Sequence, residues 1–340
     1  MLILLELDAP RKDIELIKDK IKLDGCIPHE IPGERKLAIG ITGPTNLLKE
    51  EEFKTLPSVR EVVRVTENYK LVGRQMKKED TIISLGNKKI GGNELTIIAG
   101  PCAVEQKDIM FEIAENLKNL GLSFLRGGAY KPRSSPYSFQ GLKEKGLQIL
   151  SEVKKEYNLK IVTELLDPTT IEAVLEVADI IQIGARNMQN FTLLERVGES
   201  GKPILLKRGL SATLQDFLLS AEYILSKQNF NVILCERGIR TFENATRNTL
   251  DLNAIPVLKN KSHLPIFIDP SHGIGIRKHV SSMALAGIAA GADGIIIEVH
   301  TNPATASSDG FQTLDFTELS ILIDKIKLMS PIVNKTLSLK

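Results

Sequence analysis

Eight short apolar runs alternate with helical stretches through most of this sequence. The runs are 95–99, 122–126, 159–163, 179–183, 203–206, 231–235, 265–269 and 293–298. This alternation predicts βα units around a parallel sheet. Eight units in about 240 residues are typical of an α/β fold, the closed (β/α)8 TIM barrel. An open doubly wound sheet is the competing architecture. The sequence lacks the glycine-rich dinucleotide turn or Walker loop that the usual ligands of such a sheet require.

The first seventy residues follow a different pattern, βαββαβ. Strands are expected at 2–7, 26–31, 36–41 and 59–65, with helices over 10–24 and about 46–55. This order predicts a small ferredoxin-like domain. Such a domain can bind a small ligand, or it can serve only to pair subunits, and the fold alone does not decide between these roles.

Changes in composition divide the chain into five segments. We expect a ferredoxin-like regulatory domain over 1–72, a charged linker over 73–80, a hairpin over 81–92 that caps the bottom of the barrel, the catalytic barrel over 93–330, and a tail over 331–340. The hairpin is predicted from Gly86-Asn87, a turn sequence between two short apolar stretches.

Charge and cysteine content exclude several functional classes. The 340 residues carry a net charge of +2, so no basic surplus points to nucleic acid. No apolar run is long enough to cross a bilayer, and the N-terminus lacks a basic leader. The three cysteines are an odd number, which argues against a disulfide framework. We therefore expect a cytoplasmic protein.

An ionisable or metal-binding side chain lies at or just after the carboxyl end of each of the eight predicted strands. In order these are Cys102, Arg126, Glu164, Arg186, Lys207, Arg237, His272 and Glu298. In a barrel the carboxyl ends of the strands share one face, which carries the active site. The eight side chains are therefore predicted to converge there.

The basic residues of this face predict an anion site. They are Arg126, Lys131, Arg133, Arg186, Lys207 and Arg237. Arginine matches phosphate and carboxylate oxygens bidentately, and lysine adds a point charge, so the set predicts two phosphates or a phosphate and a carboxylate. Ser134, in the segment 131–136, begins a predicted helix whose free N–H groups suit an anion. The alternative is a solvated basic loop paired with nearby acids.

Four further side chains predict a metal site. Cys102, His272, Glu298 and Asp309 combine a thiolate, an imidazole and two carboxylates, which suits Mn, Fe, Co or Zn better than Mg or Ca. Closure of the barrel places strands one and seven on either side of strand eight. Taken singly, Cys102 could equally be a buried small hydrophobe and His272 a histidine bonded within its own turn.

At these residues the sequence resembles the 3-deoxy-D-arabino-heptulosonate 7-phosphate (DAHP) synthases, specifically the group with an N-terminal ferredoxin-like domain. The resemblance spans nearly the whole chain. It rests on the stretches 99–102, 125–136, 163–164, 183–187, 206–209, 236–238, 269–272 and 298–300.

The resemblance implies an enzyme of the shikimate pathway to aromatic amino acids, a metal-dependent aldol-type transferase that condenses phosphoenolpyruvate with erythrose 4-phosphate and releases phosphate. It implies one divalent metal ion on Cys102, His272, Glu298 and Asp309. It implies phosphoenolpyruvate contacts from Arg126, Lys131, Glu164, Ala185 (through its backbone), Arg186, Lys207 and Arg237, and erythrose 4-phosphate contacts from Lys131, Pro132, Arg133 and Ser134. Lys131 is the choice for proton delivery, with Cys102 and His272 as the other catalytic residues. An aromatic amino acid is the implied effector, and the implied assembly is a homo-oligomer, a tetramer.

Two alternatives remain. A sister enzyme condenses phosphoenolpyruvate with arabinose 5-phosphate to give 3-deoxy-8-phosphooctulonate. Its phosphate segment typically reads Lys-Ala-Asn-Arg-Ser-Ser, whereas this chain has Lys131-Pro132-Arg133-Ser134-Ser135. A non-catalytic regulatory barrel is the alternative of another class, and it would show gaps in the metal or cation set.

Overall fold

The structure is a computed structural model that describes residues 1–31, 37–64, 68–133 and 135–339. The chain forms two compact units. The smaller comprises Met1–Asp80 and Asn260–His263, and the larger comprises Thr81–Lys259 and Leu264–Lys340.

The larger unit is a closed barrel of eight parallel strands, as predicted. The strands are β7 (Thr96–Gly100), β8 (Phe124–Arg126), β9 (Lys160–Glu164), β10 (Ile180–Ile183), β11 (Ile204–Lys207), β12 (Val232–Glu236), β13 (Ile266–Ile268) and β14 (Gly294–Glu298). They pair in chain order, and β14 closes the ring on β7. Nearly every strand residue is buried, because helices cover the outside and side chains fill the inside. The sequence therefore shows continuous apolar runs rather than alternation.

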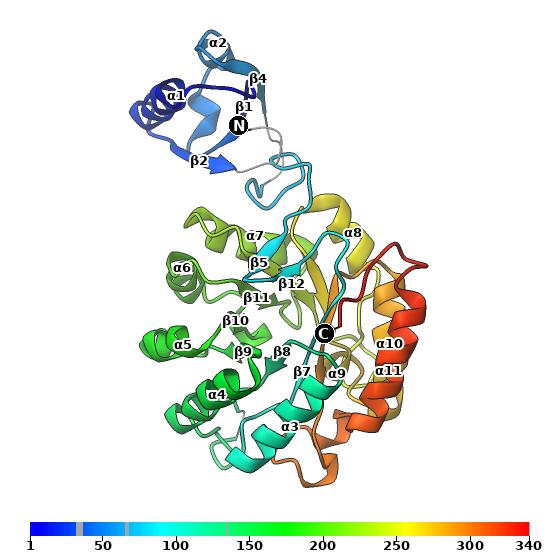
Figure 1. Ribbon diagram of the computed structural model, residues 1–340. Coiled ribbons are helices and arrows are strands. Elements are labelled where there is room, and N and C mark those ends of the chain that lie inside the picture. Colours follow the sequence, from blue (N-terminus) through cyan, green and yellow to red (C-terminus); the bar gives the residue numbers. More distant parts are fainter. Residues whose placement is uncertain (32–36, 65–67, 134, 340) are drawn as a thin grey trace. The chain divides into compact units, whose positions relative to one another are not determined.

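Helices surround the barrel, from α3 in teal to α11 in red (Figure 1). They are α3 (Lys107–Asn119), α4 (Glu144–Tyr157), α5 (Ile171–Val177), α6 (Phe191–Glu199), α7 (Leu214–Ser226), α8 (Ala254–Lys261), α9 (Pro270–Ile274), α10 (Arg277–Ala289) and α11 (Phe316–Met329). The start of α11 shows how the sequence sets a boundary, because Asp315 and Glu318 form a capping box. No helix among the described residues is long and apolar enough to span a membrane.

The bottom of the barrel is covered by a hairpin and by the C-terminal tail. Strands β5 (Ile83–Leu85) and β6 (Lys88–Ile90) pair antiparallel, and Ile83 and Ile90 join the apolar cluster of the barrel interior. In the tail, the backbone oxygen of Thr336 accepts a bond of 2.9 Å from the N–H of Leu95. The C-terminal tail thus lies beside the start of β7, the first barrel strand.

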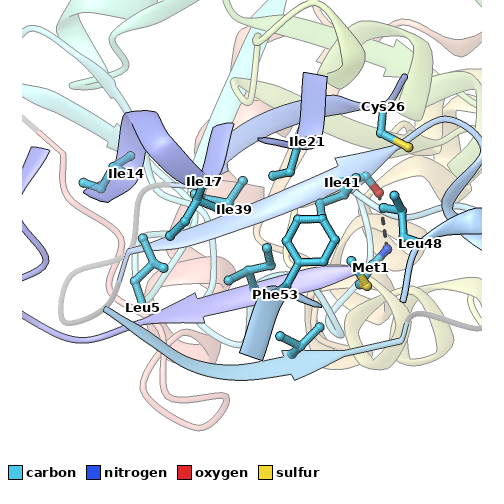
Figure 2. Packing of buried hydrophobic residues seen from close by; sticks show 12 residues of the cluster. Met1, Leu5, Ile14, Ile17, Ile21, Cys26, Ile39, Ile41, Leu48 and Phe53 are labelled. Carbon is cyan, nitrogen blue, oxygen red and sulfur yellow. Dashed lines mark hydrogen bonds between the residues drawn. The ribbon is translucent and has the colours of Figure 1, made fainter. Parts of the chain in front are cut away.

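The smaller unit is ferredoxin-like, as predicted. Its strands are β1 (Leu2–Leu5), β2 (Ile27–Ile31), β3 (Ala38–Thr42) and β4 (Val59–Val63), in the antiparallel order β2-β3-β1-β4, with α1 (Arg11–Leu23) after the first strand. One stripe of α1 faces the sheet core with Ile14, Ile17 and Ile21 (Figure 2).

The second helix of this unit is shorter than the predicted 46–55. A 3-10 turn covers Thr45–Leu47, and α2 begins only at Glu50 (Glu50–Lys54). Between them Leu48 is extended, with ψ 137°, and its side chain is buried. Because of this break, both Leu48 and the fully buried Phe53 pack into the core. In a continuous helix from residue 46 these two side chains, five positions apart, would point to different faces.

Candidate active site

The carboxyl ends of the barrel strands surround a cavity of about 480 Å³. Of the residues predicted from sequence, those lining it are Arg126, Lys131, Pro132, Arg133, Glu164, Ala185, Arg186, Lys207, Arg237, His272 and Asp309. Cys102 and Glu298 are buried and are not part of the cavity lining. Ser134 lies outside the described residues.

The cavity is strongly basic. Two more arginines line it, Arg240 and Arg247, and Glu164 and Asp309 are the acidic residues of the lining. Buried carboxylates compensate some of these charges. Arg126 Nη1 lies 3.0 Å from Glu298 Oε1, and Lys207 Nζ lies 2.5 Å from Asp269 Oδ2.

Arg237 has no such compensation. Its guanidinium is buried, and among the described residues no carboxylate lies within ion-pair distance of it. Burial lowers its pKa even though the charge of Asp269 acts in the opposite direction. Within the described part of the chain, Arg237 Nη1 donates only to a backbone oxygen, that of Gly238, at 3.4 Å. A buried cation that lacks an ion-pair partner is costly, so an anion bound in the cavity would stabilise this site.

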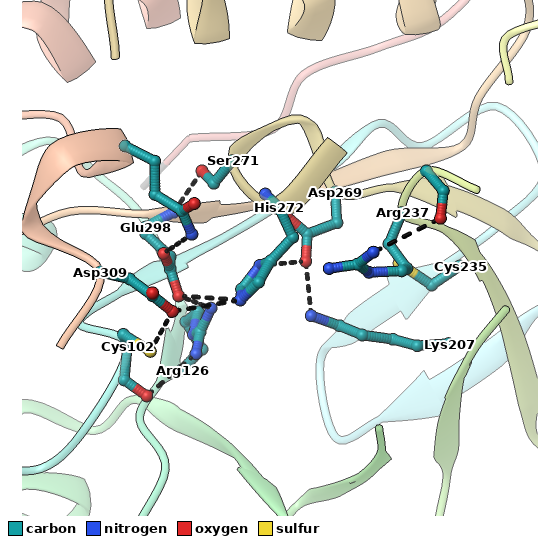
Figure 3. A network of polar contacts seen from close by, with 12 residues as sticks. Cys102, Arg126, Lys207, Cys235, Arg237, Asp269, Ser271, His272, Glu298 and Asp309 are labelled. Atoms are coloured by element: carbon teal, nitrogen blue, oxygen red, sulfur yellow. Dashed lines mark hydrogen bonds and ion pairs between the residues drawn. The ribbon is translucent and has the colours of Figure 1, made fainter. Parts of the chain in front are cut away.

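The four residues predicted as metal ligands lie together (Figure 3). One donor atom from each of Cys102, His272, Glu298 and Asp309 can be chosen so that all lie within 4.8 Å of one another. The Cys102 thiol donates to Asp309 Oδ2 at 3.2 Å, and His272 Nε2 lies 3.4 Å from Glu298 Oε1. These spacings fit donors around a single ion, because metal–ligand bonds of about 2.0–2.3 Å place ligand atoms roughly 3–4 Å apart.

The protonation of these donors also favours a cation. Burial, followed by the charge of Glu298, raises the pKa of Cys102 to about 12. Burial acts to raise the pKa values of Glu298 and Asp309. The charges around them together outweigh burial, chiefly those of His272 and Arg126 for Glu298 and of His272 and Arg247 for Asp309, so both pKa values are lowered. The cluster thus holds two ionised carboxylates and a thiol that a divalent ion would convert to a thiolate.

Asp269 contacts residues of the candidate site, and the sequence argument quoted it only as part of a motif. Its Oδ2 atom lies 2.8 Å from His272 Nδ1, and its Oδ1 accepts the backbone N–H of His272 at 2.9 Å. The same carboxylate pairs with Lys207. Its signal in the sequence is Asp269-Pro270, a typical helix start that here caps α9.

The sequence argument missed Arg240, Arg247 and Asn248 of the cavity wall, and also Gln312. The first three lie in the connection from β12 to α8, and Gln312 ends a 3-10 turn after β14. Neither segment has a periodic pattern or a motif, so nothing in the sequence separated these residues from ordinary polar loop residues.

The fold and this site together define a barrel enzyme with an anion-binding cavity beside four side chains suited to a divalent metal. The chain belongs to the DAHP synthase family. Residues 75–333 match the DAHP synthetase I family, and residues 1–67 match the DAHP synthase ferredoxin-like domain.

Individual relatives agree. A phospho-2-dehydro-3-deoxyheptonate aldolase of Thermotoga maritima is 49% identical over 330 residues, covering 97% of this chain and 98% of the relative. The crystal structure of a Thermotoga maritima DAHP synthase matches with a TM-score of 0.79 at 47% identity over 99% of both chains. A 2-dehydro-3-deoxyphosphooctonate aldolase of Syntrophobacter fumaroxidans is more distant, at 31% identity over 73% of this chain and 91% of the relative.

Proposed function

We propose that this chain is a 3-deoxy-7-phosphoheptulonate synthase, which joins phosphoenolpyruvate to erythrose 4-phosphate and releases phosphate. One observation carries the proposal. Four side chains suited to a metal offer donor atoms that lie within 4.8 Å of one another, beside a cavity of about 480 Å³ with eight lysine and arginine residues in its lining. Two phosphates and a carboxylate would fill such a cavity, and the two substrates together carry these groups.

Phosphoenolpyruvate is assigned to one part of the cavity. Its contacts are Arg126, Lys131, Glu164, Ala185, Arg186, Lys207 and Arg237. Arg237 supplies a buried charge that lacks a carboxylate partner among the described residues, and the Arg126 guanidinium is fixed by Glu298 and by the backbone oxygen of Cys102 at 3.2 Å. Donors that are already oriented lose little entropy when the anion binds.

Erythrose 4-phosphate is assigned to Lys131, Pro132, Arg133 and Ser134. Arg133 is held at two points, since Nε donates to the backbone oxygen of Phe139 at 2.9 Å and Nη2 donates to Ser308 Oγ at 2.6 Å. Ser308 in turn donates to Cys102 Sγ at 3.1 Å. This assignment brings the aldehyde end of the sugar phosphate toward the four-residue cluster.

A divalent ion of Mn, Fe, Co or Zn, held by Cys102, His272, Glu298 and Asp309, would supply Lewis-acid polarisation of the aldehyde oxygen. A bond then forms between the enol carbon of phosphoenolpyruvate and the aldehyde carbon. Water adds to the neighbouring carbon, and phosphate leaves. Lys131 is the group assigned to deliver the proton to the aldehyde oxygen. Its Nζ is held at the cavity by a 2.9 Å bond to the backbone oxygen of Cys102.

We extend the proposal to regulation and assembly. The ferredoxin-like unit is assigned the binding of an aromatic amino acid that inhibits the barrel. The chain is assigned to a homotetramer in the cytoplasm, where phosphoenolpyruvate and sugar phosphates are available.

An activity assay tests the central proposal. The metal-stripped chain is incubated with phosphoenolpyruvate and either erythrose 4-phosphate or arabinose 5-phosphate, with and without Mn²⁺, and phosphate release is measured. The proposal expects turnover with erythrose 4-phosphate, loss of turnover with a chelator and recovery with Mn²⁺. Preference for arabinose 5-phosphate would show the sister activity instead, and no turnover with either aldose would show a non-catalytic barrel.

A further inference from the structure

One short segment, Arg247-Asn248, hydrogen-bonds to His272, to Asp309 and to a residue that holds Glu298, and so lies next to three of the four candidate ligands. The backbone N–H groups of Arg247 and Asn248 donate to the oxygens of Ile274 and Gly273, at 3.0 and 3.1 Å. The Asn248 side chain donates to the backbone oxygen of His272 at 2.9 Å. The segment therefore runs alongside α9, the helix that carries His272.

The Arg247 side chain bonds to one carboxylate of the candidate metal site directly and to the other through a glutamine. Its Nη1 donates to Asp309 Oδ1 at 3.4 Å and to Gln312 Oε1 at 2.6 Å. Gln312 is fully buried, and its Nε2 donates to Glu298 Oε2 at 2.5 Å. Arg247 thus bonds directly to Asp309 and, through Gln312, to Glu298.

Two packing contacts restrict the Arg247 side chain, which is 34% exposed. Its aliphatic stem lies against Gly275, where an added β-carbon would lie 2.3 Å from Arg247 Cβ. Its guanidinium carbon lies 5.9 Å from the centre of the Phe311 ring. Gly275 has φ +68°, a conformation that glycine adopts without strain, so glycine is favoured there on two grounds.

Asp309 needs such support more than the other ligands. It lies in a loop and has a left-handed backbone conformation, with φ 56° and ψ 26°. Glu298 and Cys102, in contrast, end or closely follow barrel strands. A ligand on a loop in this conformation depends on its neighbours for its orientation.

We propose that Arg247 is a positioning residue that, together with Gln312, orients Asp309 and Glu298 for metal binding. This inference rests on the metal site proposed above. Partners of ligating side chains typically change metal affinity about 10–100-fold when they are removed.

Whether loss of the Arg247 side chain weakens or tightens metal binding distinguishes a positioning role from a purely electrostatic one. Arg247 is a cation near a cation site, so loss of its charge alone would tighten metal binding. Loss of its orienting bonds would weaken binding. Arg240 provides a matched control, because it lies in the same connection and lines the same cavity but donates to none of the four candidate ligands among the described residues.

The test is a titration of the metal-stripped full chain with Co²⁺ without oxygen, followed by the thiolate-to-cobalt absorption band. We expect Arg247→Ala and Gln312→Met to weaken Co²⁺ binding by about tenfold or more, Arg247→Lys to weaken it less, and Arg240→Ala to bind as tightly as the unchanged chain or more tightly.

Equal Co²⁺ affinity in Arg247→Ala and Arg240→Ala would overturn the inference. If thermal denaturation shows that Arg247→Ala does not fold, Arg247→Lys and Gln312→Met decide, and unchanged affinity in both would overturn it. Absence of the thiolate band in the unchanged chain would overturn the proposed metal site itself, which is a separate result.

Discussion

The Nδ1 atom of His272 lies 2.8 Å from the Oδ2 atom of Asp269. Because the same carboxylate pairs with Lys207, one buried group connects the candidate metal site with the basic cavity. The pKa of Asp269 is well below its ordinary value. Burial acts to raise this pKa, but the charges of His272 and Lys207 together outweigh burial. Asp269 is therefore ionised, and its negative charge compensates Lys207 and orients His272.

Asp269→Asn is expected to reduce both stability and activity. A neutral amide leaves Lys207 without its buried counter-charge, and breaking such a pair costs about 3–5 kcal/mol. Thermal denaturation and kcat/KM for phosphoenolpyruvate measure the two effects. Asp251→Asn is the matched control, because its partner Arg208 keeps a second carboxylate, Glu236, at 2.8 Å. Equal loss of stability in the two variants would contradict the shared role of Asp269.

Lys131→Met is expected to lose most of kcat, because it removes the group assigned to proton delivery while keeping most of the side-chain volume. Steady-state kinetics with both substrates measure this. Lys107→Met, which removes an exposed lysine paired with Glu152 on the outer helices, should retain kcat. Near-normal kcat in the Lys131 variant would remove Lys131 from that role.

A chain that begins at Gly73 is expected to remain active and to lose inhibition by aromatic amino acids. The barrel strands all lie within residues 81–340, so the shortened chain keeps every one of them. Activity is measured with and without tyrosine, phenylalanine and tryptophan, on the full and shortened chains. Full inhibition of the shortened chain would place the effector site in the barrel.

The smaller unit is expected to lose stability as the pH falls below neutrality. Burial lowers the pKa values of His29 and His263 to about 4. In the unfolded chain a histidine titrates near pKa 6.5, so between these values the unfolded state binds more protons. The free energy of unfolding then falls by up to about 1.4 kcal/mol per pH unit for each histidine.

Urea denaturation at about pH 7 and about pH 5 measures this dependence. His29→Gln should reduce the slope with pH, whereas the exposed His279→Gln should leave it unchanged. A slope that is the same in His29→Gln as in the unchanged chain would show that His29 is not responsible.

The sequence by itself was sufficient for the barrel and for most of the side chains that gather at the carboxyl ends of its strands. Apolar runs such as 203–206 identified the strands because a parallel strand covered on both faces must be largely apolar. Residues at or shortly after the carboxyl ends of the strands, such as Glu298 and His272, followed from the rule that strand ends share one face. The prediction was less accurate at 46–55, where burial of Leu48 interrupts the expected helix.

Only the tertiary structure decided which polar loop residues contact one another. Cys102 and Asp309 are 207 residues apart in the chain, yet barrel closure brings the sulfur within 3.2 Å of a carboxylate oxygen. Gln312 and Arg247 belong to segments without periodicity, and their bond depends on the folding of two separate loops. Hydrophobic periodicity specifies which residues are buried in strands and helices, but loop contacts depend on three-dimensional distances that no local pattern encodes.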